Sequence, residues 1–332
     1  MLHHTGNAVR SPVSPGGGGA AGRSFGLRDS GAATQALDRA PRRPLAGRVA
    51  TDARELVVGA IDMHCHHGPD PHRARSVDAA EAVAEAEALG MAGVVLKSHA
   101  YPTGPIAILM QKTVARLRVF GGICCDAEVG GLNPAAVEVA LRTGAKVVWM
   151  PTFSSVVDRR KLRLPGPGIP VIGLRERLVP AAEEILRLAR EHDAAVATGH
   201  IDLPEQVALV DAAHALGVRV VMTHALETLV GPDHELADVV ALADRGAVIE
   251  FTYLTCIPGG FAATSAPDTF ARAMMAVGPE RAIMSTDFGQ DRSPHPADGM
   301  RLFIDEMLRA GVAPQAIDLM ARRNPARLLG LA

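Results

Sequence analysis

The sequence predicts an α/β protein, a (β/α)8 barrel (TIM barrel) that follows a disordered N-terminal extension. From residue 57 onward, short apolar runs rich in Val, Ile and Ala alternate with stretches of helical period, and the alternation recurs eight times. Continuous apolar runs of this kind are typical of parallel strands that are buried on both faces. We therefore expect two parts, the extension over residues 1–55 and one barrel domain over residues 56–332.

The predicted strands are the apolar runs, and the predicted helices are the amphipathic stretches between them. Strands are expected at residues 57–63, 92–97, 119–124, 146–150, 194–199, 218–223, 247–251 and 282–286. Helices are expected at residues 77–89, 134–142, 180–192, 205–216, 234–244 and 267–277. An open doubly wound sheet is the alternative fold. It loses support because no Gly-x-Gly-x-x-Gly segment follows the first run and no phosphate-loop motif occurs in the chain.

The predicted extension differs in composition from the rest of the chain. It contains Ser-Pro-Val-Ser-Pro-Gly-Gly-Gly-Gly at 11–19 and Ala-Pro-Arg-Arg-Pro at 40–44, with neither a helical nor a strand period. Segments of this kind do not contain enough apolar residues to form a packed core. We interpret residues 1–55 as a basic, disordered tail.

Charge and composition exclude several classes of protein. Lys and Arg number 34 against 36 Asp and Glu, and aromatic residues make up 3% of the chain, so the basic surface and stacking rings of a nucleic-acid binder are missing. The four cysteines have no paired spacing, which is typical of a reducing cytoplasm. No apolar run approaches the roughly 20 residues of a membrane span. We expect a cytoplasmic protein with a small-molecule partner and neither a nucleic-acid nor a membrane partner. The sequence leaves open whether it forms homo-oligomers.

Polar side chains end four of the apolar runs, at the face of the barrel where such folds carry their active sites. His64 and His66 end the first run, His200 follows the fifth, His224 the sixth and Asp287 the eighth. Since residues i and i+2 of a strand point to one side, His64 and His66 are both expected to face the barrel mouth. Imidazole and carboxylate ligands suit Zn²⁺ and its first-row neighbours, and such an ion provides hydroxide at neutral pH. The pattern predicts a divalent-metal site at which Asp287 accepts the proton of the bound water.

Together these motifs resemble the amidohydrolase superfamily of metal-dependent (β/α)8 hydrolases. The resemblance rests on Asp-Met-His-Cys-His at 62–66, His200, His224, Ser-Thr-Asp at 285–287 and Asn-Pro-Ala-Arg-Leu-Leu-Gly at 324–330. It implies that His64, His66 and Asp287 hold one metal ion, and that His200 and His224 hold a second. In relatives with one metal it implies that His200 joins the first ion and that His224 assists the water or the substrate. Asp287 and His224 are accordingly the expected catalytic residues.

The sequence departs from the binuclear members of this superfamily at the fourth strand. The members that bridge their metals with a carboxylated lysine usually take that lysine from the fourth strand, whereas the fourth run here ends Val-Trp-Met-Pro-Thr at 148–152. Lys97 ends the second run and can supply the bridge from there, because a neutral lysine amine reacts with CO₂ to give a carbamate. The alternative is an ammonium group that anchors a substrate oxyanion. We expect one or two divalent ions, Zn²⁺ before Mn²⁺, Fe²⁺ or Co²⁺.

Four further residues near the predicted mouth are expected to bind substrate. Arg73 and Arg75 lie in the loop after the first strand, where a guanidinium can hold a substrate carboxylate through two hydrogen bonds. His99 shares one side of the second strand with Lys97, and Tyr101 can donate to an oxyanion. The alternative for each of these residues is ordinary packing or exposure on the surface.

Three other features have open interpretations. The long connection 152–179 is basic and is either a lid or specificity element or a solvated loop. Asp202, two residues beyond His200, is a candidate to orient that ligand. Glu250 interrupts the seventh apolar run, which indicates either a carboxylate inside the barrel or a misplaced strand.

The leading hypothesis for function is an amidohydrolase-type enzyme in which metal-bound hydroxide cleaves an amide, cyclic amide, ester or lactone bond in a small molecule. The resemblance supplies this list of bonds. A mononuclear decarboxylase or deaminase is the second hypothesis, and the lack of a bridging residue on the fourth strand favours it. Deaminases typically have a Glu close after the fifth-strand histidine, whereas Ile-Asp-Leu-Pro-Glu stands at 201–205. A metal-dependent scaffold without catalysis is the third, and the retained strand-end ligands count against it.

Overall fold

The protein folds as a barrel of eight parallel strands. The computed structural model describes residues 53–331, and in this part of the chain each strand pairs in parallel with the next. The strands are β1 (Ile61–His66), β2 (Gly93–Lys97), β3 (Arg118–Cys124), β4 (Ala145–Trp149), β5 (Ala195–Ala197), β6 (Val220–Met222), β7 (Val248–Thr252) and β8 (Ala282–Ser285). Just beyond β8, the Asp287 amide donates to the His64 carbonyl at 2.9 Å, and the His66 amide donates to the Phe288 carbonyl at 2.8 Å. These bonds join the last strand to the first, so the predicted (β/α)8 barrel is confirmed.

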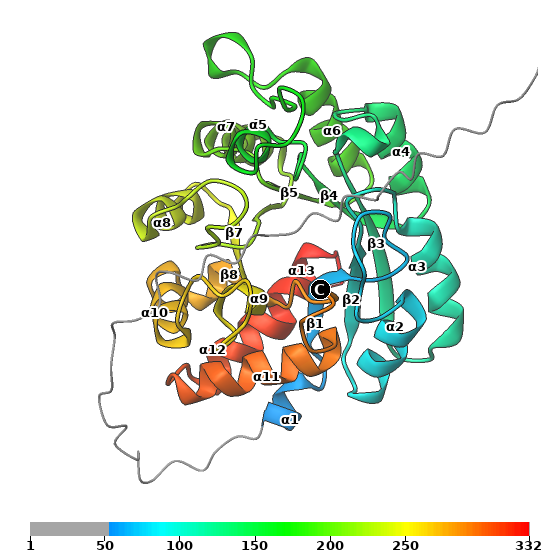
Figure 1. Ribbon diagram of the computed structural model, residues 1–332, viewed down its shortest axis with the longest axis vertical. Coiled ribbons are helices and arrows are strands. Elements are labelled where there is room, and N and C mark those ends of the chain that lie inside the picture. The colour runs from blue at the N-terminus through cyan, green and yellow to red at the C-terminus, as the bar shows by residue number, and fades with distance from the viewer. Residues whose placement is uncertain (1–52, 332) are drawn as a thin grey trace, which may run out of the picture. The chain divides into compact units, whose positions relative to one another are not determined.

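The helices surround the strands (Figure 1). They are α1 (Ala53–Val57), α2 (Ala79–Ala88), α3 (Gly104–Met110), α4 (Pro134–Arg142), α5 (Val156–Lys161), α6 (Pro180–Glu191), α7 (Leu203–Leu216), α8 (Leu236–Asp244), α9 (Tyr253–Cys256), α10 (Pro267–Val277), α11 (Pro296–Arg309), α12 (Pro314–Asp318) and α13 (Asn324–Leu328). No helix of residues 53–331 is long and apolar enough to cross a membrane.

Two apolar layers hold the barrel together. Val95 of β2 and Trp149 of β4 belong to the cluster inside the ring of strands, whereas Leu96 and Val148, their neighbours in sequence, belong to the larger cluster that includes helix residues. Successive residues of a strand point to opposite faces, and here both faces are buried. Burial on both faces explains why the strands read as continuous apolar runs.

Capping residues mark where two of the helices begin. The Asp78 carboxylate accepts from the Glu81 amide at 2.8 Å, and the Glu81 carboxylate accepts from the Asp78 amide at 2.9 Å, which is a capping box at the start of α2. Asp202 and Glu205 form the same arrangement at the start of α7, with both hydrogen bonds at 3.1 Å. The Asp202 carboxylate is therefore engaged at a helix start, and the hypothesis that it orients His200 finds no support.

The first strand begins later than the apolar run that predicted it. Residues Ala53–Val57 form α1, and the chain turns at Gly59, whose φ of 83° favours glycine. The run 57–63 thus spans the end of a helix, a turn and the start of β1. Of the predicted extension 1–55, residues 53–55 belong to α1, and residues 1–52 lie outside the described part of the chain.

Candidate metal centre

The ends of β1 and β8 bring three of the predicted metal ligands together. His64 Nε2 and His66 Nε2 each lie 3.1 Å from Oδ1 of Asp287, and all three residues are buried. They are one of two groups among residues 53–331 whose imidazole, thiol or carboxylate donor atoms lie within 4.8 Å of one another. We call His64, His66 and Asp287 the metal triad.

Asp62 fixes the backbone from which the metal triad projects. One of its carboxylate oxygens accepts from the His64 amide at 3.1 Å and from the Thr286 amide at 3.0 Å, and the other accepts from the Thr286 hydroxyl at 2.5 Å. Burial raises the pKa of Asp62 to about 6 although these bonds oppose the shift. The carboxylate of Asp62 thereby links β1 to Thr286, the residue just before Asp287.

Lys97 reaches the metal triad from β2. Its Nζ lies 2.9 Å from Nε2 of His64 and 5.1 Å from the centre of the Trp149 ring of β4, and its side chain is among the largest that are fully buried. The Trp149 ring thus occupies the end of β4, and the Lys97 amine on β2 lies beside His64. The geometry is compatible with Lys97 serving either as a bridge or as an anchor.

His200 and His224 lie beside the metal triad. Their ring centres are 4.8 Å apart, and the His224 ring is 6.2 Å from that of His64. His224 has a φ of 33° and Asp287 a φ of 56°, a strained conformation that is frequent at functional sites. Both residues are thus held in place at an energetic cost.

Three buried imidazole nitrogens lack a hydrogen-bond partner among residues 53–331. They are Nε2 of His224, Nδ1 of His66 and Nε2 of His67. A buried polar atom without a partner is costly, so it indicates a group that binds there. The unpaired His224 nitrogen and the imidazole and carboxylate donors of the metal triad fit a divalent first-row ion.

Burial and neighbouring charges set the ionisation of these groups. Burial lowers the pKa of His66 and of His224 well below its ordinary value, which favours the neutral imidazole that coordinates metals. Burial opposes ionisation of Asp287, but the His64 and His66 rings outweigh it and hold the pKa of this carboxyl well below its usual range. Burial would also lower the pKa of His64, yet the Asp287 and Glu250 charges raise it to about 9.

Glu250 of β7 orients His64 from behind. Its Oε2 lies 3.1 Å from Nδ1 of His64 and accepts from the His224 amide at 3.2 Å. A carboxylate can only accept, so it holds the proton of His64 on Nδ1 and leaves Nε2 directed at Asp287 and Lys97. Carboxylates placed in this way behind a metal-binding histidine fix the ring and raise its basicity. Of the two interpretations of Glu250, the carboxylate inside the barrel is the one observed.

Comparison with known proteins identifies the family. The model of a family of unknown function, DUF6282, matches residues 59–250. The chain belongs to this family. The matched part of the DUF6282 protein carries His64, His66, His200 and His224 but stops before Asp287. Comparison with curated proteins gave no match.

Solved structures share the barrel of this DUF6282 protein. The probable dipeptidase PvdM from Pseudomonas aeruginosa is 11% identical, with a TM-score of 0.60 over 84% of this chain and 96% of its own. An amidohydrolase from Pseudomonas aeruginosa is 13% identical, with a TM-score of 0.55 over 84% and 98%. The 2,6-dihydroxybenzoate decarboxylase from Rhizobium is 12% identical, with a TM-score of 0.53 over 82% and 99%. At these identities the likeness establishes the fold, and this fold is the one that the amidohydrolase resemblance implied.

Asp158 of the DUF6282 protein is a site residue that the sequence did not point to. It is fully buried on α5, its Oδ2 lies 2.5 Å from Nδ1 of His200, and its Oδ1 accepts from the Gly231 amide at 2.7 Å. One turn further on, Lys161 donates to the Gly231 carbonyl at 2.9 Å and to Asp233 at 2.7 Å. The α5 segment of the connection 152–179 therefore contacts the loop after β6. Asp158 stands next to a run of basic residues, and that context gave no sign of its burial.

A second group of potential metal donors lies next to the metal triad and consists of His99, Cys124 and Asp126. Hydrogen bonds already explain much of this cluster, because Thr152 Oγ1 lies 2.7 Å from His99 Nδ1 and donates to Asp126. The other Asp126 oxygen accepts from the amide of Thr152 and from that of Ser154, each at 2.9 Å. The His99 ring stacks on His66 at 5.0 Å between centres, so the predicted substrate-binding histidine lies at the metal triad.

The other predicted substrate-binding residues have different surroundings. Arg75 is paired with Asp70, and its side chain is 3% exposed. Tyr101 donates its hydroxyl to the Pro69 carbonyl. Arg73 is exposed, and its guanidinium lies 4.7 Å from the centre of the Phe153 ring.

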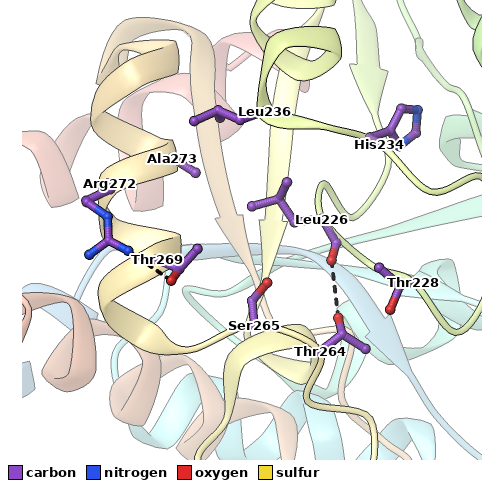
Figure 2. Close-up of a pocket in the computed structure, with 9 residues that line it drawn as sticks. All are labelled: Leu226, Thr228, His234, Leu236, Thr264, Ser265, Thr269, Arg272 and Ala273. Carbon is purple, nitrogen blue, oxygen red and sulfur yellow. Dashed lines mark hydrogen bonds between the residues drawn. The ribbon is translucent and has the colours of Figure 1, made fainter. Parts of the chain in front are cut away.

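None of these residues lines the pocket of about 320 Å³ that Figure 2 shows. Leu226 and Thr228 of the loop after His224 line it together with residues of α10, among them Arg272, which donates to Thr269 at 3.1 Å. None of the predicted metal ligands lines this pocket.

Proposed function

We propose that this DUF6282 protein is an amidohydrolase-type, metal-dependent enzyme that hydrolyses an amide, cyclic amide, ester or lactone bond in a small molecule. The observation that carries the proposal is the metal triad, in which two imidazole nitrogens from β1 each lie 3.1 Å from one carboxylate oxygen next to β8. Two more histidines, His200 and His224, lie beside it. The solved structures with this barrel include proteins described as an amidohydrolase and a probable dipeptidase, which is consistent with the proposal.

His64, His66 and Asp287 would hold a divalent ion, which supplies a Lewis acid and a water of lowered pKa. Asp287 has a second carboxylate oxygen with which to accept the proton of the attacking water, and it later returns that proton to the leaving group. With one ion bound, His224 would use its unpaired Nε2 to bind the water or the substrate oxygen. Glu250 and Asp158 hold the His64 and His200 rings in the orientation that these roles require.

A second ion would be held by His200 and His224, with Lys97 as the bridge in its carboxylated form. The proximity of Nζ to His64 Nε2, 2.9 Å, supports a role for Lys97 at the centre. Zn²⁺ is the metal that we propose, and Mn²⁺, Fe²⁺ and Co²⁺ suit the same donors. We also propose a cytoplasmic location, which the four buried free cysteines support.

A mononuclear decarboxylase is the second candidate. Trp149 at the end of β4 favours it, because this ring leaves β4 without a bridging side chain. A deaminase has less support. Deaminases typically have a Glu close after the fifth-strand histidine, and Glu205 is the first Glu after His200 in this chain. Its carboxylate, however, accepts from the Val171 amide at 2.7 Å and from the Asp202 amide. Glu205 is thus occupied away from the metal triad.

The proposal is tested by metal analysis together with a hydrolysis screen. Full-length protein purified without chelator should carry zinc or another first-row divalent ion, and it should hydrolyse members of a panel of lactones, esters, cyclic amides and N-acyl amino acids. Asp287→Asn should keep the fold and lower turnover by about 10²–10⁴-fold. A protein that binds no divalent ion, or a variant with unchanged turnover, would refute the proposed mechanism.

A further inference from the structure

The loop between β1 and α2 contains Arg73 and Arg75, and the two side chains have different hydrogen-bond partners. Asp70 organises this loop, because its Oδ1 accepts from the amides of His72 at 2.8 Å and Arg73 at 3.1 Å. Its Oδ2 accepts from Nε of Arg75 at 2.9 Å and from Nη2 at 2.6 Å, and Nη1 of Arg75 donates to Gln290. Every arm of the Arg75 guanidinium is therefore engaged inside the protein. Its role is to fix the loop.

Arg73 has no comparable partner. Its guanidinium makes no hydrogen bond or ion pair within residues 53–331, and its contact there is with the face of Phe153, 4.7 Å from the ring centre. Stacking on an aromatic ring holds a guanidinium in one plane and leaves its N–H groups free to donate. The hydrogen bond from its amide to Asp70 fixes the point from which the side chain extends.

Phe153 places this guanidinium beside the candidate metal centre. Its ring forms T-shaped contacts with His99 at 4.7 Å and with His200 at 5.4 Å between centres, and these two histidines contact His66 and His224 in turn. Although Arg73 is exposed, partial desolvation of its guanidinium and the charge of Arg75 lower its pKa, while the charges of Asp70, Asp287 and Asp158 raise it. Arg73 thus lies within electrostatic range of the metal triad, whose carboxylate belongs to another loop.

We propose that the substrate carries an anionic group, a carboxylate or a phosphate, and that Arg73 binds it while the scissile bond lies at the metal triad. This inference rests on the proposed hydrolytic function. A planar guanidinium with free N–H groups matches either anion through two parallel hydrogen bonds.

Metal-chelating probes test the inference without knowledge of the substrate. We would measure the binding of hydroxamates to zinc-loaded full-length protein by isothermal titration calorimetry. One set bears a carboxylate tail (malonyl, succinyl and glutaryl monohydroxamates), a second set contains the corresponding methyl esters, and a third bears a phosphonate tail of the same length. The variants are Arg73→Gln, Arg73→Lys and the matched control Arg116→Gln, which removes an exposed charge before the start of β3.

The wild type should bind at least one charged probe about tenfold or more tightly than its neutral ester. Arg73→Gln should abolish this preference, Arg73→Lys should keep part of it, and Arg116→Gln should keep all of it. The charged tail that raises the binding affinity more, carboxylate or phosphonate, identifies the anionic group of the substrate. Two results would overturn the role of Arg73 without affecting the proposed function. One is equal binding of charged and neutral probes by the wild type, and the other is a preference for charged probes that persists in Arg73→Gln. If the protein takes up no zinc, the metal centre is refuted, and the proposed function and this inference fail together. If zinc-loaded protein binds none of the probes, this inference alone is overturned.

Discussion

Asp158 Oδ2 and His200 Nδ1 are 2.5 Å apart, and the contact joins α5 to the end of β5. The carboxylate is fully buried, and its other oxygen accepts from the Gly231 amide. Because a carboxylate only accepts, Asp158 keeps the His200 proton on Nδ1 and leaves Nε2 free to coordinate. The connection after β4 thereby controls the orientation of a predicted metal ligand on the next strand.

Asp158→Asn should weaken metal binding. An amide can present its N–H₂ group to His200, which would move the ring proton to Nε2 and block coordination. Loss of such an outer partner typically lowers metal affinity by about 10–100-fold. The measurement is competition for zinc between the protein and a chromogenic chelator.

Asp202→Asn is the matched control for this change. Asp202 lies closer to His200 in sequence, but its carboxylate caps α7, and Asn caps helices as well as Asp does. Its zinc affinity should stay within a factor of about 2 of wild type. Equal losses in both variants would mean that Asp158 acts through general stability rather than through His200.

The strands and the metal triad could be predicted because they follow from local periodicity. Side chains alternate along a strand, so His64 and His66 share one direction, and the closure of a barrel brings Asp287 next to them. Lys97 follows by the same rule from β2. The placements of His64, His66 and Lys97 do not depend on the path of a loop, and Asp287 follows the end of β8 by only two residues.

The residues that the sequence did not point to depend on loop paths. Asp158 reaches His200 only because α5 lies against the loop after β6, and no period in the sequence encodes that path. The difference between Arg73 and Arg75 arises likewise from the turn at Asp70. Glu250 was recognisable as an interruption of an apolar run, but its partner His64 is 186 positions away.

Lys97→Ala should change the metal content if Lys97 forms the bridge. In protein purified with bicarbonate, about two divalent ions per chain should fall to one or none. Lys97→Arg is the control that keeps a cation but cannot form the carbamate. Elemental analysis gives the count. About one ion per chain in wild type and in both variants would make Lys97 a substrate anchor and favour the decarboxylase candidate.

Glu227→Gln should make stability less dependent on pH. Burial raises the pKa of Glu227 from 4.5 to about 7, so the folded protein holds this proton at pH values where the unfolded chain has lost it. The stabilisation from the neutral carboxyl is complete below pH 4.5 and is lost as pH rises towards 7. The difference between the pKa of 4.5 and that of about 7 corresponds to a change of at most about 3 kcal/mol in the free energy of unfolding.

The melting temperature of Glu227→Gln minus that of wild type should therefore grow between pH 4.5 and about 7 and then level off. Gln fits this position because its carbonyl can accept from the Leu229 and Thr228 amides, and the Thr255 hydroxyl can turn to accept from its N–H₂ group. The exposed Glu191→Gln on α6 serves as control and should show no such trend. A difference that does not change with pH would contradict the raised pKa of Glu227.

Thr152→Val should change the tautomer of His99. The Thr152 hydroxyl has one proton and donates it to the Asp126 carboxylate, so His99 Nδ1, 2.7 Å away, must be the donor in its contact with Thr152. His99 therefore carries its proton on Nδ1 and presents a bare Nε2. Valine keeps the shape of threonine but removes the acceptor, and it leaves an Asp126 oxygen short of a partner at a cost of about 1–3 kcal/mol.

Nitrogen NMR of histidine-labelled protein, with His99 assigned from a His99→Gln variant, distinguishes the tautomers. The wild type and Thr152→Ser should both show His99 protonated on Nδ1, because serine keeps the hydroxyl. Thr152→Val should shift the population towards the form protonated on Nε2. A tautomer that is the same in the valine variant and in the wild type would show that the Asp126 and Thr152 pair does not govern His99. In that case the stacking of His99 on His66 would be the principal interaction that fixes the His99 ring.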